Sequence, residues 1–447
     1  KKIKMGLLQS RLAPSLTLDS VDSEFCNLRG FGYDEHGELG PDAKPFGQQH
    51  NVVHSSAGTH HSLAILRDAS MTSWGSNVYG QLGNGKINSD KKNDSNPYPS
   101  PIHLPRSHAS HRVIRVAAGI SHSACVTDHG MLFTWGLGQE GQLGYICDAS
   151  SPKFAGTSWR CQTTPRHVAA LTNVPVESVS LGHKFTVVLS TEGEVYAFGE
   201  GKHYVLGTGS QRTMFEPTKL ELQGIKKICT GWTHSMALNN RGQVFTWGSP
   251  YYEINQTVPP QKVPTLVEGI AGNVNDIAAG DYHNTILVVG SDLVPGVHTW
   301  GGNGFGQLGY DTSHQVDPNL VHTPKFVDLK TTLCRYVYSG GCSTYVVTSD
   351  GRVFAWGSNQ SAQFGPGLPP VVREPTVIFE SRSEKIQELA VGHSHILIMT
   401  KSMTVSHRAE GTACTELAEM GLKSTRNLLS PPKLALSEEQ PDILHEV

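Results

Sequence analysis

Five histidines recur at one place in a repeated word, and imidazoles at a regular spacing can bind metal ions or transfer protons. The word reads small-Gly-x-x-His-Ser, and two degenerate copies place Phe185 and Ser343 where the histidine stands. A metal site or a catalytic centre needs its histidine once, whereas a structural role needs one in every repeat. We therefore expect a structural role, with each imidazole bonded to a backbone carbonyl of its own or the neighbouring repeat, and no metal site. The histidines are His61, His122, His234, His283 and His395.

Other signatures of catalysis are missing from the sequence. There is no G-x-x-x-x-G-K-[ST] phosphate loop, no H-E-x-x-H zinc helix and no G-x-S-x-G nucleophile turn. Ser, His and Asp are plentiful, but no spacing assembles a triad. We therefore expect no cofactor and no covalent chemistry.

The amino-acid composition limits which partners and which cellular compartments we expect. The 447 residues carry a net charge of −3 and only 17% charged residues, so there is no strong nucleic-acid signal. Eight scattered cysteines fit a reducing, intracellular compartment, and no apolar run approaches the ~18 residues of a membrane span. The basic start, KKIKMGLLQSRLAPSLTL, fits a processed import signal, a nuclear-type tip or an artificial boundary, so nucleus, cytoplasm and mitochondrion stay open.

A second repeated word surrounds the first. It opens with an aromatic residue and a glycine, and most copies end in a Gly-Gln-Leu-Gly-like turn, as in WGSNVYGQLG. Seven copies alternate with the seven histidine words, which indicates one repeat architecture. Large aromatic side chains at this position are expected to fill the space between repeats. The anchors are Phe31, Trp74, Trp135, Phe198, Trp247, Trp300 and Trp356.

Short apolar segments separated by turn residues lie between the two words. Thr186–Gly199, TVVLSTEGEVYAFG, has two apolar runs around Glu-Gly, which is typical of a β-hairpin. A further strand precedes each histidine word, as at Val113–Gly119, and a proline often stands a few residues upstream, where we expect it to fix the entry of that strand into the next unit. Each unit therefore predicts an antiparallel sheet of about four strands. Such sheets hide their apolar faces by radial stacking, so we predict an all-β, seven-bladed β-propeller.

The two words resemble those of the regulator of chromosome condensation family, whose fold is a seven-bladed β-propeller. The resemblance covers about residues 24–401 and implies ring closure. The aromatic-Gly strand Asn27–Gly32 lacks a preceding hairpin partner, and Glu388–Thr400 lacks an aromatic-Gly strand after it. Pairing the two would complete one blade and remove an open edge. We divide the chain into an N-terminal extension (1–23), the propeller (24–401) and a C-terminal tail (402–447).

The C-terminal tail shows no repeat and admits two interpretations. It contains one candidate short helix, Thr412–Leu429, before an acidic, proline-containing end. It is either a disordered linker or a docking segment that orders on a partner.

Three interruptions of the repeat are candidate partner-binding loops, because binding residues concentrate on loops of rigid scaffolds. Asn84–Arg112 is polar and locally basic, Tyr145–Val168 carries aromatic residues amid small ones, and Ser249–Pro264 replaces a regular turn. An exposed aromatic residue in an insertion is a candidate hot spot, and the alternative is that each loop packs on its own propeller. The candidate residues are Lys91, Lys92, Phe154, Trp159, Tyr251 and Tyr252.

The resemblance leaves two functions open. One is a non-enzymatic scaffold or regulator, a monomer or a subunit, that presents its loops to a protein partner such as a small GTPase or a large assembly. The other is guanine-nucleotide exchange on a Ran-like small GTPase, as in the family's founding nuclear member, which has acidic residues in the two positions before the motif histidine of consecutive blades. Here only Asp281 holds such a place, so it is the catalytic candidate if exchange occurs. We favour the scaffold.

The other residues in those two positions differ from repeat to repeat. They include one tryptophan, Trp232, whereas plant ultraviolet-B receptors of this family cluster several tryptophans on one face, so we do not expect photoreception. The pairs are Thr59-His60, Ile120-Ser121, His183-Lys184, Trp232-Thr233, Gly341-Cys342 and His393-Ser394.

Overall fold

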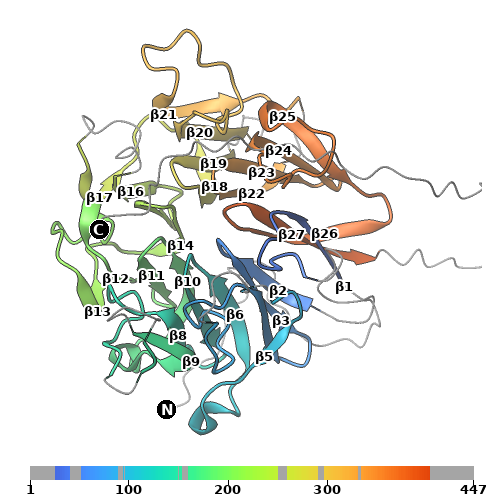
Figure 1. Cartoon of the computed structure of the whole chain (residues 1–447). Coiled ribbons are helices and arrows are strands. Elements are labelled where there is room, and N and C mark those ends of the chain that lie inside the picture. The colour runs from blue at the N-terminus through green and yellow to red at the C-terminus, as the bar shows by residue number, and fades with distance from the viewer. Residues whose placement is uncertain are drawn as a thin grey trace, which may run out of the picture. The chain divides into compact units, whose positions relative to one another are not determined.

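Seven antiparallel β-sheets form a ring around a central axis (Figure 1). The computed structural model describes residues 26–40, 52–88, 94, 96–148, 151–153, 160–249, 259–289, 296–330 and 334–402. Each sheet is one blade, with its first strand at the axis and its last at the rim. The predicted all-β, seven-bladed propeller is confirmed.

Blades 1 to 3 each contain four strands in chain order. Blade 1 consists of β2 (Val52–Ala57), β3 (His61–Leu66), β4 (Met71–Gly75) and β5 (Ser100–Ile102). Blade 2 consists of β6 (Val113–Ala118), β7 (His122–Thr127), β8 (Leu132–Leu137) and β9 (Cys161–His167). Blade 3 consists of β10 (Val176–Leu181), β11 (Phe185–Ser190), β12 (Val195–Gly199) and β13 (Met214–Lys219).

Blades 4 to 6 repeat this order, and blade 7 joins the two ends of the propeller. Blade 4 consists of β14 (Ile225–Thr230), β15 (His234–Asn239), β16 (Val244–Gly248) and β17 (Gln261–Leu266). Blade 5 consists of β18 (Asn273–Ala279), β19 (His283–Val289), β20 (Gly296–Gly302) and β21 (Leu320–Val327). Blade 6 consists of β22 (Cys334–Gly340), β23 (Ser343–Thr348), β24 (Arg352–Ser358) and β25 (Val371–Glu380). Blade 7 consists of β26 (Glu384–Val391), β27 (His395–Ser402) and β1 (Cys26–Gly32). Short 3₁₀ turns occur at η3 (Arg106–His108), η4 (Ala169–Leu171) and η5 (Lys202–Tyr204).

Burial within a blade follows from the stacking of blades. Second strands such as β7, β11 and β15 are buried at every position, because both of their faces contact neighbouring blades. The rim strand β13 has only half-buried and exposed positions. At the rim a strand tolerates proline, since a missing backbone N–H costs least at a sheet edge. The repeated prolines therefore mark rim strands rather than the entry to the next blade: Pro165, Pro217, Pro264, Pro324 and Pro375.

The ring closes through the first and last described strands. β1 pairs antiparallel with β27, from Cys26 opposite Lys401 to Gly32 opposite His395. In Figure 1 the blue β1 lies beside the orange-red β27, with β26 on the other side of β27. The predicted closure is confirmed, and it leaves the apolar faces of blades 7 and 1 packed together around Leu28, Leu397 and Trp74.

The first interruption contains more regular structure than its sequence suggests. Ser100–Ile102 pairs with Met71–Ser73 as the rim strand of blade 1, and η3 follows it. The candidate helix of the tail lies outside the described residues.

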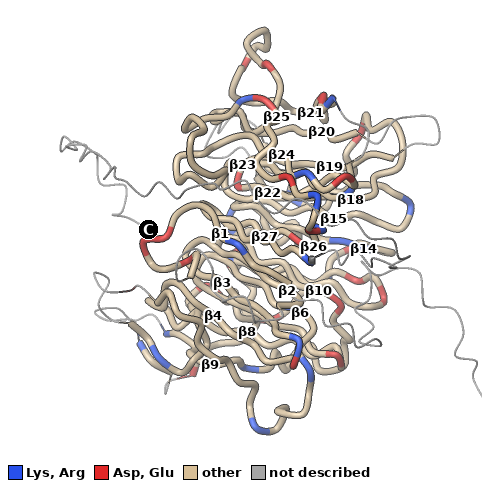
Figure 2. The backbone as a smooth tube through the Cα atoms, turned by 90° about the vertical axis from the view of Figure 1, so that its right-hand side faces the viewer, with Lys and Arg blue, Asp and Glu red and all other residues tan. Residues whose placement is uncertain are grey.

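The surface carries charges of both signs, and the cysteines form no disulfides among the described residues. Figure 2 shows acidic and basic residues interspersed over the described backbone. The described cysteines are free thiols. None of the helices in the described ranges has the length and apolar character needed to cross a membrane.

Candidate functional site

A hydrogen-bonded relay links neighbouring blades through the motif histidines. His61 Nε2 lies 2.8 Å from Ser123 Oγ of blade 2, and this hydroxyl donates to the Gln81 carbonyl at 2.8 Å. The same carbonyl accepts the indole N–H of Trp135 at 2.8 Å. The relay recurs with His283, Thr344, the Gln307 carbonyl and Trp356, and with His395, Ser62, the Glu38 carbonyl and Trp74.

The relay differs from the expected bond between imidazole and backbone carbonyl. The imidazole reaches a side chain of the next blade instead: the hydroxyl of Thr186 for His122, and the amide oxygen of Asn284 for His234. Where a hydroxyl donates its proton to a carbonyl, the imidazole must donate to the hydroxyl, so Nε2 carries the proton. For His61, His122, His283 and His395 the carbonyl is therefore reached through one intervening hydroxyl.

Burial keeps the motif histidines neutral. It lowers the pKa of His61, His122, His283 and His395 to about 3 and that of His234 to about 4. Their side chains are fully buried, and each Nε2 already has a partner. The Nε2 contacts with the next blade are those that a structural role predicts, each Nδ1 has no hydrogen-bond partner among the described residues, and the structural role stays our interpretation.

The anchor tryptophans lie between blades, and Trp135, Trp247 and Trp356 each lie against the glycine that ends the preceding copy of their word. A Cβ on Gly83 would lie 2.6 Å from Trp135 Nε1, and a Cβ on Gly309 would lie 2.6 Å from Trp356 Nε1. Only glycine fits so close to an indole, and both glycines have a positive φ. Burial is complete or nearly so for all five anchor tryptophans: Trp74, Trp135, Trp247, Trp300 and Trp356.

The turns that carry the histidine words surround one end of a channel of ≈ 100 Å³. Neighbouring turns approach closely, since a Cβ on Gly58 would lie 2.2 Å from the Gly119 carbonyl oxygen. Backbone bonds also pass between them, as from Asp281 N to Gly341 O at 2.8 Å. We call the residues that follow the word's glycine the mouth: Thr59, Ile120, His183, Trp232, Asp281, Gly341 and His393.

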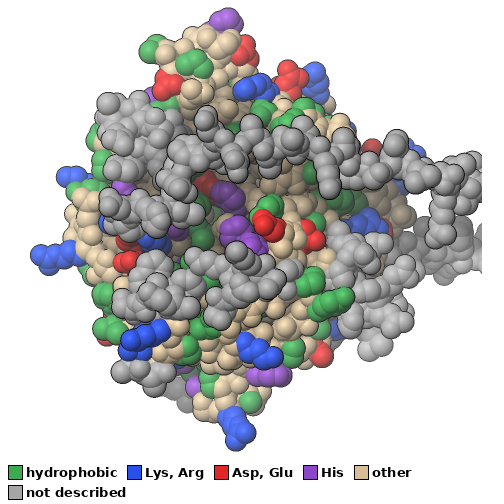
Figure 3. Space-filling model, viewed as in Figure 1, with side chains coloured by type: hydrophobic (Ala, Val, Ile, Leu, Met, Phe, Trp, Pro, Cys, Tyr) green, Lys and Arg blue, Asp and Glu red, His purple; other side chains and the backbone are tan. Residues whose placement is uncertain are grey.

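Four mouth positions carry large polar or aromatic side chains that contact one another. Asp281 Oδ2 lies 2.8 Å from His393 Nδ1. The ring centroids of His183 and Trp232 are 4.2 Å apart, and those of Trp232 and His393 are 5.9 Å apart. The His393 side chain is 41% exposed, so this cluster is open to a partner. Figure 3 shows histidine and acidic side chains near the centre of one face.

The two mouth histidines have opposite pKa shifts. Burial, assisted by the positive charge of Lys184, lowers the pKa of His183 to about 4. Burial also acts to lower the pKa of His393, but the hydrogen bond and negative charge of Asp281 outweigh it and raise that pKa above its ordinary value. The mouth therefore combines a neutral imidazole packed against an indole with a histidine–carboxylate pair.

The sequence candidates divide between the mouth and the undescribed loops. Asp281 lies at the mouth, beside His393. The six partner-binding candidates lie outside the described residues: Lys91, Lys92, Phe154, Trp159, Tyr251 and Tyr252.

The sequence was also compared with models of known protein families. Residues 27–294 match the RCC1-like domain, which is more than half of the chain. The chain belongs to the RCC1-like family. Residues 335–363 and 350–399 of this RCC1-like chain also match the regulator of chromosome condensation (RCC1) repeat.

Curated relatives and solved structures cover most of this RCC1-like chain. It is 28% identical to the ultraviolet-B receptor UVR8 of Arabidopsis thaliana over 81% of its own length and 77% of that protein. It is 26% identical to the E3 ubiquitin-protein ligase HERC2 of Mus musculus over 78% of its length but only 7% of HERC2. The crystal structure of Prp20p from Saccharomyces cerevisiae, described with its binding properties to Gsp1p and histones, superposes with a TM-score of 0.70 and 19% identity, covering 86% of this chain and 93% of Prp20p.

Sequence reasoning did not select His183 and His393 as site residues. Their signal is present, because both stand in the two positions before the histidine place of the word, which holds Phe185 in one copy and His395 in the other, and these two positions differ most between copies. Their contacts with Trp232 and Asp281 follow from the arrangement of the blades around the ring. The spacing of these residues along the chain does not predict those contacts.

Proposed function

We propose that this chain is a non-enzymatic interaction scaffold that binds a protein partner at the mouth. The proposal rests on the uneven distribution of side chains among the seven mouth positions. His183, Trp232, Asp281 and His393 gather their side chains together, whereas blades 1, 2 and 6 present Thr59, Ile120 and Gly341.

The chemistry of the mouth favours a partner that inserts a basic side chain. An arginine or lysine would pair with the Asp281 carboxylate and contact the face of Trp232. Asp281 is already paired with His393, so an incoming cation would compete with that imidazole. A channel of ≈ 100 Å³ accommodates several water molecules or the tip of one side chain, but not a folded segment.

A small GTPase is the partner class that we favour. The resemblance to the family's founding member supports it, as does the likeness in fold to Prp20p, whose structure is described with its binding to Gsp1p. The second candidate function is guanine-nucleotide exchange on a Ran-like GTPase, and the acidic Asp281 at the mouth is the observation that favours it.

Affinity capture with the full chain tests the scaffold. We compare wild type with a variant carrying Trp232→Ala, Asp281→Ala and His393→Ala, and with Phe326→Ala, which alters an exposed rim side chain. The mouth variant should lose a specific partner that wild type and Phe326→Ala retain. Equal capture by all three proteins would refute binding at the mouth.

Release of a fluorescent guanine nucleotide separates the two functions. The scaffold proposal expects binding of a small GTPase without faster release. Faster release by wild type and not by Asp281→Ala would replace the scaffold with exchange activity.

A further inference from the structure

The loop that follows β1 departs from the other copies of its word in a chemically specific way. Glu38 stands where four copies have glutamine: Gln81, Gln142, Gln307 and Gln363. In those copies the side-chain oxygen accepts the backbone N–H two residues earlier, as Gln81 Oε1 does from Tyr79 at 2.8 Å. Glu38 keeps this bond with Oε2, which accepts the His36 N–H at 3.0 Å. Its other oxygen therefore replaces an amide nitrogen.

That replacement puts an acceptor where other blades have a donor. Gln81 Nε2 donates to Ser76 Oγ at 3.2 Å. Glu38 Oε1 has no hydrogen-bond donor among the described residues, although the Glu38 side chain is fully buried. A buried carboxylate oxygen in this position needs a cation or a donated proton.

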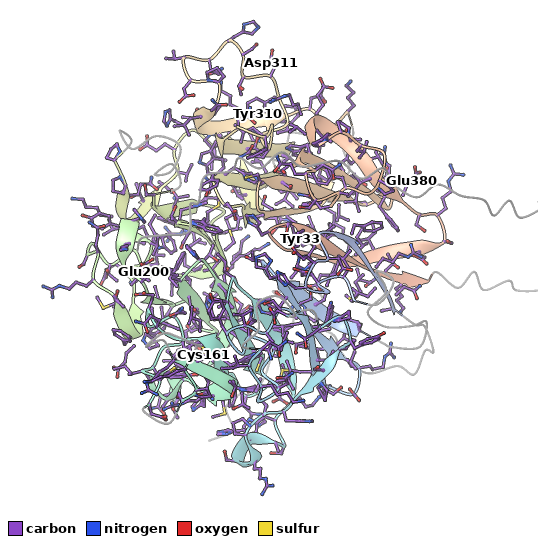
Figure 4. All side chains as sticks on the ribbon, viewed as in Figure 1. Tyr33, Cys161, Glu200, Tyr310, Asp311 and Glu380 are labelled. Atoms are coloured by element: carbon purple, nitrogen blue, oxygen red, sulfur yellow. The ribbon has the colours of Figure 1, made fainter. Side chains whose placement is uncertain are left out.

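Two histidines lie beside this oxygen. His60 Nδ1, also buried and without a hydrogen-bond partner among the described residues, is 3.5 Å from Glu38 Oε1. The rings of His36 and His60 are 5.2 Å apart, and one ligand atom from each of His36, Glu38 and His60 lies within 4.8 Å of the others. The buried Asp94 carboxylate lies 4.0 Å from His36 Nδ1 and adds negative charge. Figure 4 labels Tyr33 at the start of this loop.

We propose that His36, Glu38 and His60 bind a divalent transition-metal ion of the Zn²⁺ type. Imidazole nitrogens and a carboxylate oxygen are zinc ligands, and two ligand atoms about 2.1 Å from a tetrahedral ion lie roughly 3.4 Å apart. The 3.5 Å between His60 and Glu38 matches that spacing. Three protein ligands leave one position for water or a partner's side chain, on the side where His60 is 41% exposed.

The ion would connect the two blades at which the ring closes. His36 and Glu38 follow β1 of blade 7, whereas His60 lies in the turn between β2 and β3 of blade 1. The ion would therefore join blade 7 to blade 1. Its ligands are not mouth residues, and the proposal does not depend on the proposed function.

Cobalt binding to the tag-free, chelator-treated full chain tests the site. Wild type should bind one Co²⁺ with the visible absorption of a tetrahedral complex, and Zn²⁺ should displace it and raise the melting temperature. Glu38→Gln should weaken Co²⁺ binding at least tenfold and abolish the rise, while keeping the fold, because four other copies carry glutamine there.

Two further variants make the result decisive. His60→Ser introduces the residue found at Ser121 and Ser394, and it should also lose Co²⁺ if Glu38→Gln proves unstable. His129→Ala alters the more exposed cluster of His111, Asp128 and His129, and it should leave this Co²⁺ signal unchanged. An absence of Co²⁺ binding in wild type, or equal binding by wild type and the folded Glu38→Gln or His60→Ser variant, would leave only a contact between Glu38 and His60 and overturn the proposal.

Discussion

Trp232 and His234 are two residues apart in one turn, yet they belong to different parts of the molecule. His234 is buried and faces the next blade, where its Nε2 lies 3.0 Å from Asn284 Oδ1. Trp232 faces the mouth, and its ring lies against that of His183 at a tilt of 36°. The position of His234 is histidine in five of seven copies, whereas the position of Trp232 holds six different residue types in seven copies. The position that keeps the same residue type in most blades holds neighbouring blades together. The position whose residue type varies is available to recognise a partner.

The largest expected contrast is between a buried and a half-buried tryptophan. Trp135→Ala removes a fully buried side chain between blades 1 and 2, and we expect it to lower the free energy of unfolding by about 3–5 kcal/mol. Trp232→Ala should cost under about 1 kcal/mol, because the residue lies at the mouth rather than in a core. Urea unfolding followed by circular dichroism measures both, and equal losses would abolish the distinction.

Removing one relay hydroxyl should have a smaller effect. Thr344→Val leaves the His283 N–H facing a methyl group, at a cost of about 1–3 kcal/mol in the free energy of unfolding. Thr376→Val is the matched control, since its hydroxyl bonds only the nearby Glu374 carbonyl in the rim strand β25. If the two valine variants unfold at the same urea concentration, the relay contributes nothing beyond a local bond.

Acid should distinguish the relay from the mouth. The pKa of His122 is lowered by burial to about 3, so between pH 6.5 and that value the unfolded chain binds a proton that the folded chain excludes. The free energy of unfolding therefore falls as pH falls in this window. His122→Phe, the residue type found at Phe185, should reduce that fall by about 1.4 kcal/mol per pH unit.

Urea unfolding at pH 7.5, 6.0 and 5.0 checks the prediction for His122→Phe. The variant should lose stability more slowly than wild type on acidification, whatever its stability at pH 7.5. An identical pH dependence would mean that His122 is protonated in the folded chain.

The smallest effect is expected at the pair that Asp281 and His393 form at the mouth. Asp281→Ala should lower the pKa of His393, because the hydrogen bond and charge that raise it are removed while burial remains. The pair stabilises the fold at pH below the ordinary histidine pKa and loses this contribution as pH rises through the raised pKa. The cost should stay under about 1 kcal/mol, since the His393 side chain is 41% exposed. Titration of the His393 ring by NMR measures the shift, and an unchanged pKa would show that Asp281 does not set it.

The fold could be predicted from the sequence because its signals are local and repeated. The hairpin turns, the glycines and the anchor tryptophans each recur at a regular place, and the unpaired ends implied the contact of β1 with β27. The prolines were less informative, since their place in the rim strands follows from hydrogen bonding at an edge. The hydroxyl in the relay was missed because the serine or threonine belongs to the next blade.

The candidate site could be predicted only in part, because it depends on adjacency around the ring. Asp281 stood out by its charge, but His393 is distant from it in sequence and meets it across the channel. The metal site proposed at Glu38 was missed for a related reason: a glutamate in place of glutamine appears conservative until His60 is seen beside it.

Photo-crosslinking tests the central claim most directly. A photoreactive residue is placed either at position 393, on the mouth, or at position 326, on an exposed rim strand, and crosslinked partners are identified after irradiation in cells. We predict a defined protein partner crosslinked from position 393 and absent from position 326. The same partner crosslinked only from position 326, or equally from both, would contradict recognition at the mouth.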